Sequence, residues 1–133
     1  MLNGALGGLV AITAEPLMPT PLMAIIIGGI GGALVFAGTE LLTAMKIDDV
    51  VGAIPVHLIA GVWGTLAVPI TNPDTSFGTQ FLGTASICVF VFVVSIIIWS
   101  IMKATIGIRI SEEAEKEGTD VAETGVIAYS IRD

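Results

Sequence analysis

Residues 50–73 read VVGAIPVHLIAGVWGTLAVPITNP, a run of 24 residues without any Asp, Glu, Lys or Arg. As an α-helix this run extends about 36 Å, which is enough to cross the hydrocarbon core of a bilayer. His57, the only histidine of the chain, lies inside it. Because an ionisable side chain is costly to hold at membrane depth, His57 is a candidate functional residue. It suits proton or ammonium chemistry, a ligand contact or a single interhelical hydrogen bond.

Further apolar segments lie on both sides of this run. Residues 16–39 and 75–102 are uncharged and long enough to span a membrane. Residues 2–14 extend only about 20 Å as a helix, so we interpret them as most of a helix whose beginning is absent. The chain is 54% hydrophobic and 13% charged, against about 25% charged residues in soluble domains. The sequence therefore predicts an all-α integral membrane protein. Its helices are expected at about 2–14, 22–45, 50–69 and 79–107, within a transmembrane region 1–110 followed by a tail, 111–133.

The basic residues predict how the chain is oriented in the membrane. Lys46 lies between the second and third helices and the other four follow the last uncharged run, 75–102, whereas loops 15–21 and 70–78 have none. By the positive-inside rule, the Lys46 loop and the C-terminal tail are cytoplasmic, as in a multi-pass protein of the inner (plasma) membrane. The net charge of −7, with seven of the twelve acids in the tail, does not suggest a nucleic-acid partner.

The residues around His57 suggest how its helix is built. Asp48 and Asp49 precede the helix, where carboxylates cap the first amides and favour the positive end of the helix dipole. Pro55 predicts a bend or a late start just before His57. On an α-helix, Ile54 and Gly61 share the face of His57. Trp63 lies off that face, so we expect it to pack against a neighbouring helix.

The other segments predict packing and local caps. Small residues at Gly4, Gly8 and 28–32 favour close helix contacts. The last span is apolar on every side and is expected to face lipid. Glu15 is expected to be a solvated loop acid, and Cys88 a small buried hydrophobe without a disulfide partner. In the tail, Ser111 is expected to cap the start of a short helical turn, and Gly118 to end it.

Four stretches together resemble one transporter family. They are NGALGGLVAIT (3–13), KIDDVVGAIPVHLIAGVWGTLAV (46–68), KATIGIRISEEAEKEGTDV (103–121) and residues 125–129. The chain resembles the C-terminal third of an ammonium transporter of the Amt/Mep/Rh superfamily, with its last four transmembrane helices and cytosolic tail. The resemblance implies part of an eleven-helix bundle of two inverted halves, in which each protomer of a homotrimer holds a pore. It implies a transporter, with no enzymatic activity, cofactor or metal.

The resemblance also assigns roles to residues. His57 matches the second of two stacked pore histidines, and the first belongs to upstream helices that are absent here. Ile54 and Gly61 are second-tier lining candidates. Asp48 and Asp49 match an acidic pair, for which we keep the capping role. The tail matches a regulatory segment that packs beneath neighbouring protomers and can meet PII-type signalling proteins; its residues of interest are Ser111, Glu112, Glu113, Gly118 and Tyr129.

We therefore expect the complete protein to carry ammonium or ammonia across the membrane, with this chain as one wall of the pore. The chain needs the remaining N-terminal helices and is not expected to conduct alone. Leu58 departs from the glycine common after the histidine, which would narrow or reshape the lumen. Two alternatives stay open. In the first, the chain is a non-transport structural or regulatory subunit of an ammonium-sensing membrane complex. In the second, it is an inactive truncated product.

Overall fold

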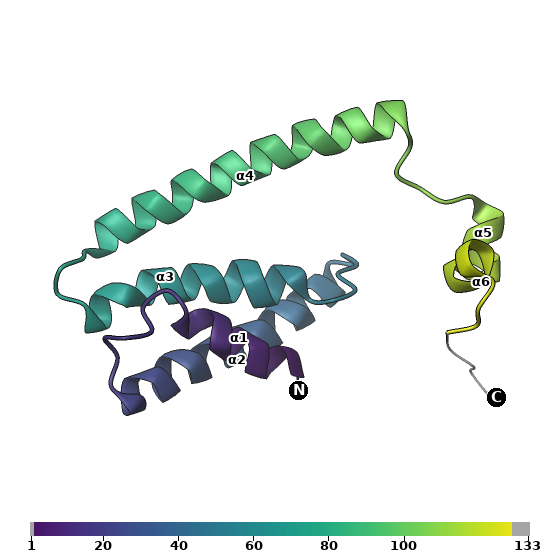
Figure 1. Cartoon of the computed structure of the whole chain (residues 1–133). Helices are drawn as coiled ribbons and strands as arrows, with labels where there is room; N and C mark the ends of the chain where they lie inside the picture. Colours follow the sequence, from purple (N-terminus) through teal and green to yellow (C-terminus); the bar gives the residue numbers. More distant parts are fainter. Residues whose placement is uncertain (1, 129–133) are drawn as a thin grey trace. The chain divides into compact units, whose positions relative to one another are not determined.

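The computed structural model describes residues 2–128, and all regular structure in this range is helical. The predicted all-α fold is therefore confirmed. The chain divides into two compact units, residues 2–90 and 91–128, with the longest helix running through the boundary. The elements in chain order (Figure 1) are α1 Leu2–Ile12, α2 Pro21–Ala44, the π-helix η1 Ile54–Ile59, α3 Ala60–Thr71, α4 Phe77–Thr105, α5 Glu112–Glu117 and α6 Thr119–Thr124.

Three helical segments are long and apolar enough to cross a membrane. They are α2, the continuous segment formed by η1 and α3 (Ile54–Thr71), and α4. The first helix, α1, is apolar but only 11 residues long. The chain is thus a multi-pass membrane protein. Its third span begins at Ile54, four residues later than the sequence suggested, because Gly52 adopts a positive φ of 74° that interrupts the helix.

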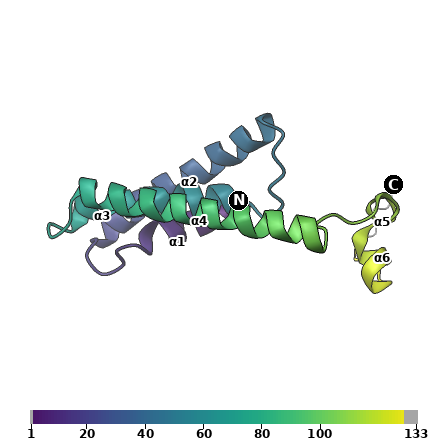
Figure 2. The ribbon, with the colours of Figure 1, turned by 90° about the horizontal axis from the view of Figure 1, so that it is seen from above.

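The first unit is held together by backbone-close packing of α1 on α2 (Figures 1 and 2). A Cβ atom added to Gly8 would lie 3.0 Å from the carbonyl oxygen of Gly28, and one added to Gly32 would lie 3.0 Å from that of Gly4. Both pairs are spaced four residues apart on their helices, so they form one continuous contact face. Glycine is required there because a side chain would separate the two backbones.

Small residues also let α3 pack closely against α1 and α2. Ala60, Gly64 and Ala67 are buried, and a Cβ atom on Gly64 would overlap the backbone of Ala11. Around these residues lie two small apolar clusters that join α1, α2 and the η1–α3 segment. These clusters determine which face of η1 and α3 packs against α1 and α2. The opposite face lies outside both clusters.

No residue of α4 is buried, and its large apolar side chains are exposed along the whole helix, Phe77–Thr105. Apolar residues lie on every side of this helix, a pattern typical of a helix in a membrane or in the core of a large protein. The backbone groups are satisfied within the helix, so a long run of β-branched residues that would favour a strand in water remains helical here.

Candidate functional site

Asp49 anchors the start of the π-helix that carries His57. Its Oδ1 accepts a hydrogen bond from the amide of Ala53 at 2.8 Å, and its Oδ2 accepts one from the amide of Ile54 at 2.8 Å. One carboxylate thus satisfies two amides that the helix leaves unpaired. Asp48 is exposed, and its carboxylate makes no such bond within residues 2–128. The side-chain amide of Asn3 adds a tie from α1 to the carbonyl of Val51 at 3.2 Å.

Replacing Asp49 with Ala is expected to loosen this helix start and lower the unfolding free energy by about 1–2 kcal/mol. The same change at Asp48 removes an equal charge but no cap, so it serves as the matched control and should leave stability nearly unchanged. Thermal unfolding of the two variants in detergent micelles measures the difference. Equal effects of the two substitutions would show that charge, and not the paired hydrogen bonds, matters here.

The π-helix determines which residues share the face of His57. Pro55 lacks an amide hydrogen and lies in the first turn, where the missing donor is least costly. A π-helix pairs residues five apart and turns more slowly than an α-helix. Gly61, four residues after His57, lies beside it, whereas Ile54, three residues before, does not line the same opening. The expected α-helical spacing holds on one side of His57 and fails on the other.

His57 is exposed and lines an opening of about 290 Å³ within the first unit. Two sets of residues with α-helical spacing face this opening, one from η1–α3 and one from the first turns of α4. Within residues 2–128, the imidazole has no hydrogen-bond partner, and the buried hydroxyl of Thr84 is also unpaired. The lining residues are His57, Leu58, Gly61, Val62 and Thr65, together with Gln80, Gly83, Thr84, Ile87 and Cys88.

The chemistry of this opening is that of a weakly polar slot. A neutral imidazole donates one hydrogen bond and accepts another, and both positions are free here. Glycine at Gly61 leaves room beside the ring, while Leu58 presents an apolar side chain next to it. Such a surface can hold a small polar molecule without offering a charged partner. Cys88, expected to be buried, is only half-buried and lines this opening.

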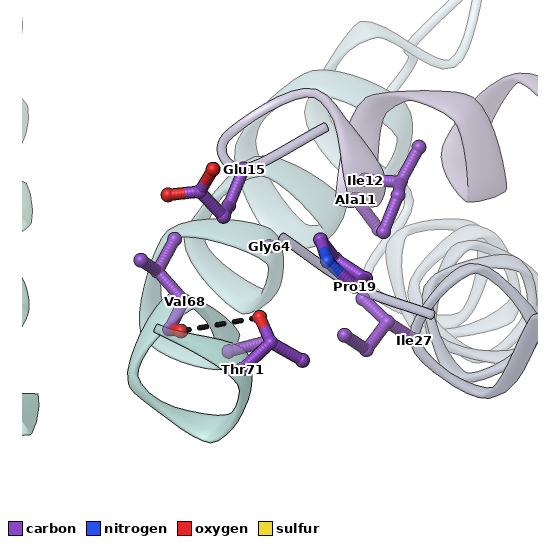
Figure 3. A pocket seen from close by; sticks show the side chains of 9 residues that line it. Ala11, Ile12, Glu15, Pro19, Ile27, Gly64, Val68 and Thr71 are labelled. Carbon is purple, nitrogen blue, oxygen red and sulfur yellow. Dashed lines mark hydrogen bonds between the residues drawn. The ribbon is translucent and has the colours of Figure 1, made fainter. Parts of the chain in front are cut away.

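Sequence reasoning missed a hydrogen bond between two side chains at the other end of α3. Figure 3 shows the small pocket beside it, where Glu15 lies. Glu15, expected to be a solvated loop acid, is half-buried and lines a small pocket with Thr71 and Pro19. Its Oε2 accepts a hydrogen bond from the side-chain amide of Asn72 at 2.9 Å. The two residues are 57 positions apart, and nothing in either segment indicates the other as its partner. The bond fastens the loop after α1 to the end of α3.

The predicted tail residues occupy the second unit. The hydroxyl of Ser111 accepts a hydrogen bond from the amide of Ala114 at 3.2 Å and caps α5. Gly118 ends α5 with a φ of 102°, a conformation that favours glycine. Glu112 and Glu113 are exposed in the first turn of α5, where acids suit the helix dipole. Tyr129 lies outside the described residues.

Asp120 folds the chain after α6 back onto that helix. Its Oδ2 accepts a hydrogen bond from the amide of Ala128 at 2.7 Å. This bond, followed by one from the amide of Val121, lowers the pKa of Asp120 below its ordinary value of 3.8, because both favour the ionised carboxylate. Nothing in the sequence indicates this link, since it joins a residue of α6 to one in the irregular segment that follows that helix.

A lowered pKa in the folded state predicts a definite direction of pH dependence. The stabilisation by Asp120 is fully present above its ordinary pKa and is lost as the pH falls through the lower folded value. We therefore expect the Ala128 amide to keep its hydrogen bond at neutral pH and to lose it only in strong acid, as followed by its amide chemical shift. Asp120→Asn should abolish this transition, whereas Glu115→Gln should preserve it. If Glu115→Gln abolished the transition and Asp120→Asn did not, the assignment to Asp120 would be contradicted.

Comparison with known proteins identifies the group to which the chain belongs. The sequence profile of the Ammonium Transporter Family matches residues 1–129. A putative ammonium transporter from Synechocystis is 40% identical over 93% of this chain and 28% of its own length. Ammonium transporters from Haloferax mediterranei and Bacillus subtilis are 35% and 37% identical over 97% and 96% of this chain. The chain spans only 26% and 35% of the lengths of these two relatives. With nearly all of its residues matched, this chain belongs to the ammonium transporter family.

Proposed function

We propose that this chain forms one wall of a path for ammonium or ammonia through the membrane, with His57 as its central polar residue. The observation that carries the proposal is the exposed, unpaired imidazole on a π-turn inside a membrane-spanning segment of an ammonium transporter family member. An ionisable side chain at membrane depth is a candidate functional group, so we assign the unpaired imidazole a transient partner.

The free imidazole suits a small nitrogen ligand. Ammonia donates and accepts hydrogen bonds, and neutral His57 offers both an acceptor and a donor nitrogen. In a weakly polar slot a free cation is costly, so ammonium is expected to shed its hydration shell or its proton before it passes the ring. Gly61 leaves space for the ligand at the ring, and Leu58 keeps that space apolar. Ile54 does not line this opening, and we keep it as a second-tier lining candidate of the complete pore.

The pore needs protein beyond these helices. The chain spans about a third or less of the relatives described above, so the activity of a complete transporter is part of the proposal. We assign a further pore histidine to the remaining N-terminal helices and expect a homotrimer in the inner membrane. The Lys46 loop and the tail lie on the cytoplasmic side, following the bias of basic residues. The chain alone is not expected to conduct.

The tail is assigned a regulatory role in this proposal. Capped by Ser111 and stopped at Gly118, α5 presents Glu112 and Glu113 to solvent, where a neighbouring protomer or a PII-type signalling protein can bind. Tyr129 is expected to belong to the same contact.

A complementation experiment tests the proposal. Cells that lack ammonium uptake receive a complete transporter that contains residues 1–133, the same transporter without residues 46–71, or the chain alone. Growth on limiting ammonium is expected only with the complete transporter. If the complete transporter never restores uptake but the chain binds a signalling partner, the regulatory alternative replaces transport. If the deletion leaves uptake intact, His57 and its helix have no part in the path.

A further inference from the structure

Trp63 makes a directional bond from α3 to another helix. Its indole Nε1–H donates to the carbonyl oxygen of Ile27 in α2 at 3.0 Å, across 36 positions of sequence. Its ring packs beside the buried cluster of Ala11, Ile27 and Ala67. The ring is half-buried, and its N–H is satisfied by this carbonyl.

The Trp63 bond and His57 belong to two different faces of one continuous helical segment. Ala60, Gly64, Ala67 and Val68 are the buried residues of α3, and the indole of Trp63 donates to a carbonyl of α2. His57 and Gly61 form the face that lines the opening. Since η1 and α3 are continuous, any rotation of α3 about its axis carries the imidazole with it.

The contacts of the buried face are apolar and therefore have no preferred direction of their own. Its alanine and glycine residues allow close approach of the helices, and Val56 and Val68 add branched apolar side chains to the same buried surface. Pro55 and the π-turn make the N-terminal end of the segment less regular than a continuous α-helix. Of the side-chain hydrogen bonds made by Ile54–Thr71 within the described residues, only that of Trp63 reaches another element; those of Thr65 and Thr71 go to carbonyls of α3 itself.

We propose that Trp63 is a positioning residue, whose hydrogen bond to the Ile27 carbonyl sets the rotation of α3 and thereby the direction in which the His57 imidazole points. This inference rests on the proposed function for its biological meaning, but its physical content concerns only the orientation of one ring. It assigns the indole no contact with the transported molecule.

The single histidine of the chain makes the inference directly measurable. Diethyl pyrocarbonate acylates neutral imidazole, and mass spectrometry of the full chain in detergent micelles gives the rate at His57. Trp63→Phe keeps an aromatic ring but removes the donor. We expect the rate to change by about fivefold, the ratio that one neutral hydrogen bond sustains. Trp99→Phe, a change at an exposed tryptophan on α4, is the control and should leave the rate unaltered.

A second substitution keeps the test decisive if Trp63→Phe does not fold, as judged by its circular dichroism. Replacing the indole with its benzothiophene analogue removes only the N–H and should change the rate by the same factor. An unchanged rate in a folded variant overturns the inference. A changed rate supports it even if a separate assay of His57→Ala shows normal ammonium uptake, in which case only the proposed function falls. The two failures are therefore distinguishable.

Discussion

Replacing His57 with Ala in a complete transporter that contains this chain is expected to reduce ammonium uptake by about a hundredfold or more. The imidazole is exposed on a face of a membrane-spanning segment and has no partner within residues 2–128. Its loss removes a ring that donates one hydrogen bond, accepts another and can carry a proton, which the neighbouring hydroxyl and amide groups do not do. Losses of this size are typical when a group that handles protons is removed. The measurement is the current or the uptake of radiolabelled methylammonium in vesicles.

The substitution has informative controls. His57→Gln retains a donor and an acceptor but cannot be protonated, so it separates hydrogen bonding from proton transfer. Val50→Ala changes an exposed apolar residue that precedes the helix and should keep normal uptake. If His57→Ala transports as well and as selectively as the native protein, the imidazole has no role in the path, and its free face must be explained by packing against other helices.

Adding one methyl group at Gly31 is expected to destabilise the helix bundle strongly. The Cβ of Gly31→Ala would lie 2.6 Å from the Cβ of Ala11 and 2.9 Å from the carbonyl oxygen of Gly7. Neither neighbour can move without displacing α1, since one is backbone and the other is fixed directly to it. Overpacking of this kind costs about 1–3 kcal/mol. The midpoint of thermal unfolding of the chain in micelles should fall accordingly.

Gly29 provides the matched control for that prediction. It lies two residues away on the same helix, α2, and a Cβ atom placed on it meets nothing within 4 Å. Gly29→Ala gains the same helix propensity as Gly31→Ala without the clash, so we expect no loss of stability. If both substitutions behave alike, the close contact of α1 with α2 is not what stabilises this unit.

The features that the sequence predicted well depend on composition and local spacing. Uncharged length alone located the spanning segments, and the helix period placed Gly61 beside His57. The glycines of the first two helices were expected to permit close packing, and the structure brings the backbones of Gly8 and Gly28 together. These predictions succeeded because hydrophobicity and helical spacing depend only on residues that are close in sequence.

The features that could not be predicted from the sequence depend on a distant partner or on a change of helix type. The bond between Glu15 and Asn72 could not be inferred because nothing in either segment specifies the other. Ile54 does not line the opening beside His57, and the slower turn of a π-helix changes which residues share a face with the histidine. Pro55 signalled an irregularity at this place, but it did not specify which kind of turn would form.

The central claim is that His57 faces a water-accessible path for ammonium inside the membrane. It is tested most directly by placing a thiol at this position, as His57→Cys in a Cys88→Ser background, in a complete transporter. A small, water-soluble methanethiosulfonate reagent is expected to modify the new thiol, and ammonium is expected to slow the reaction. Modification only by a lipid-soluble reagent, with no protection by ammonium, would mean that this position faces acyl chains and would contradict the account.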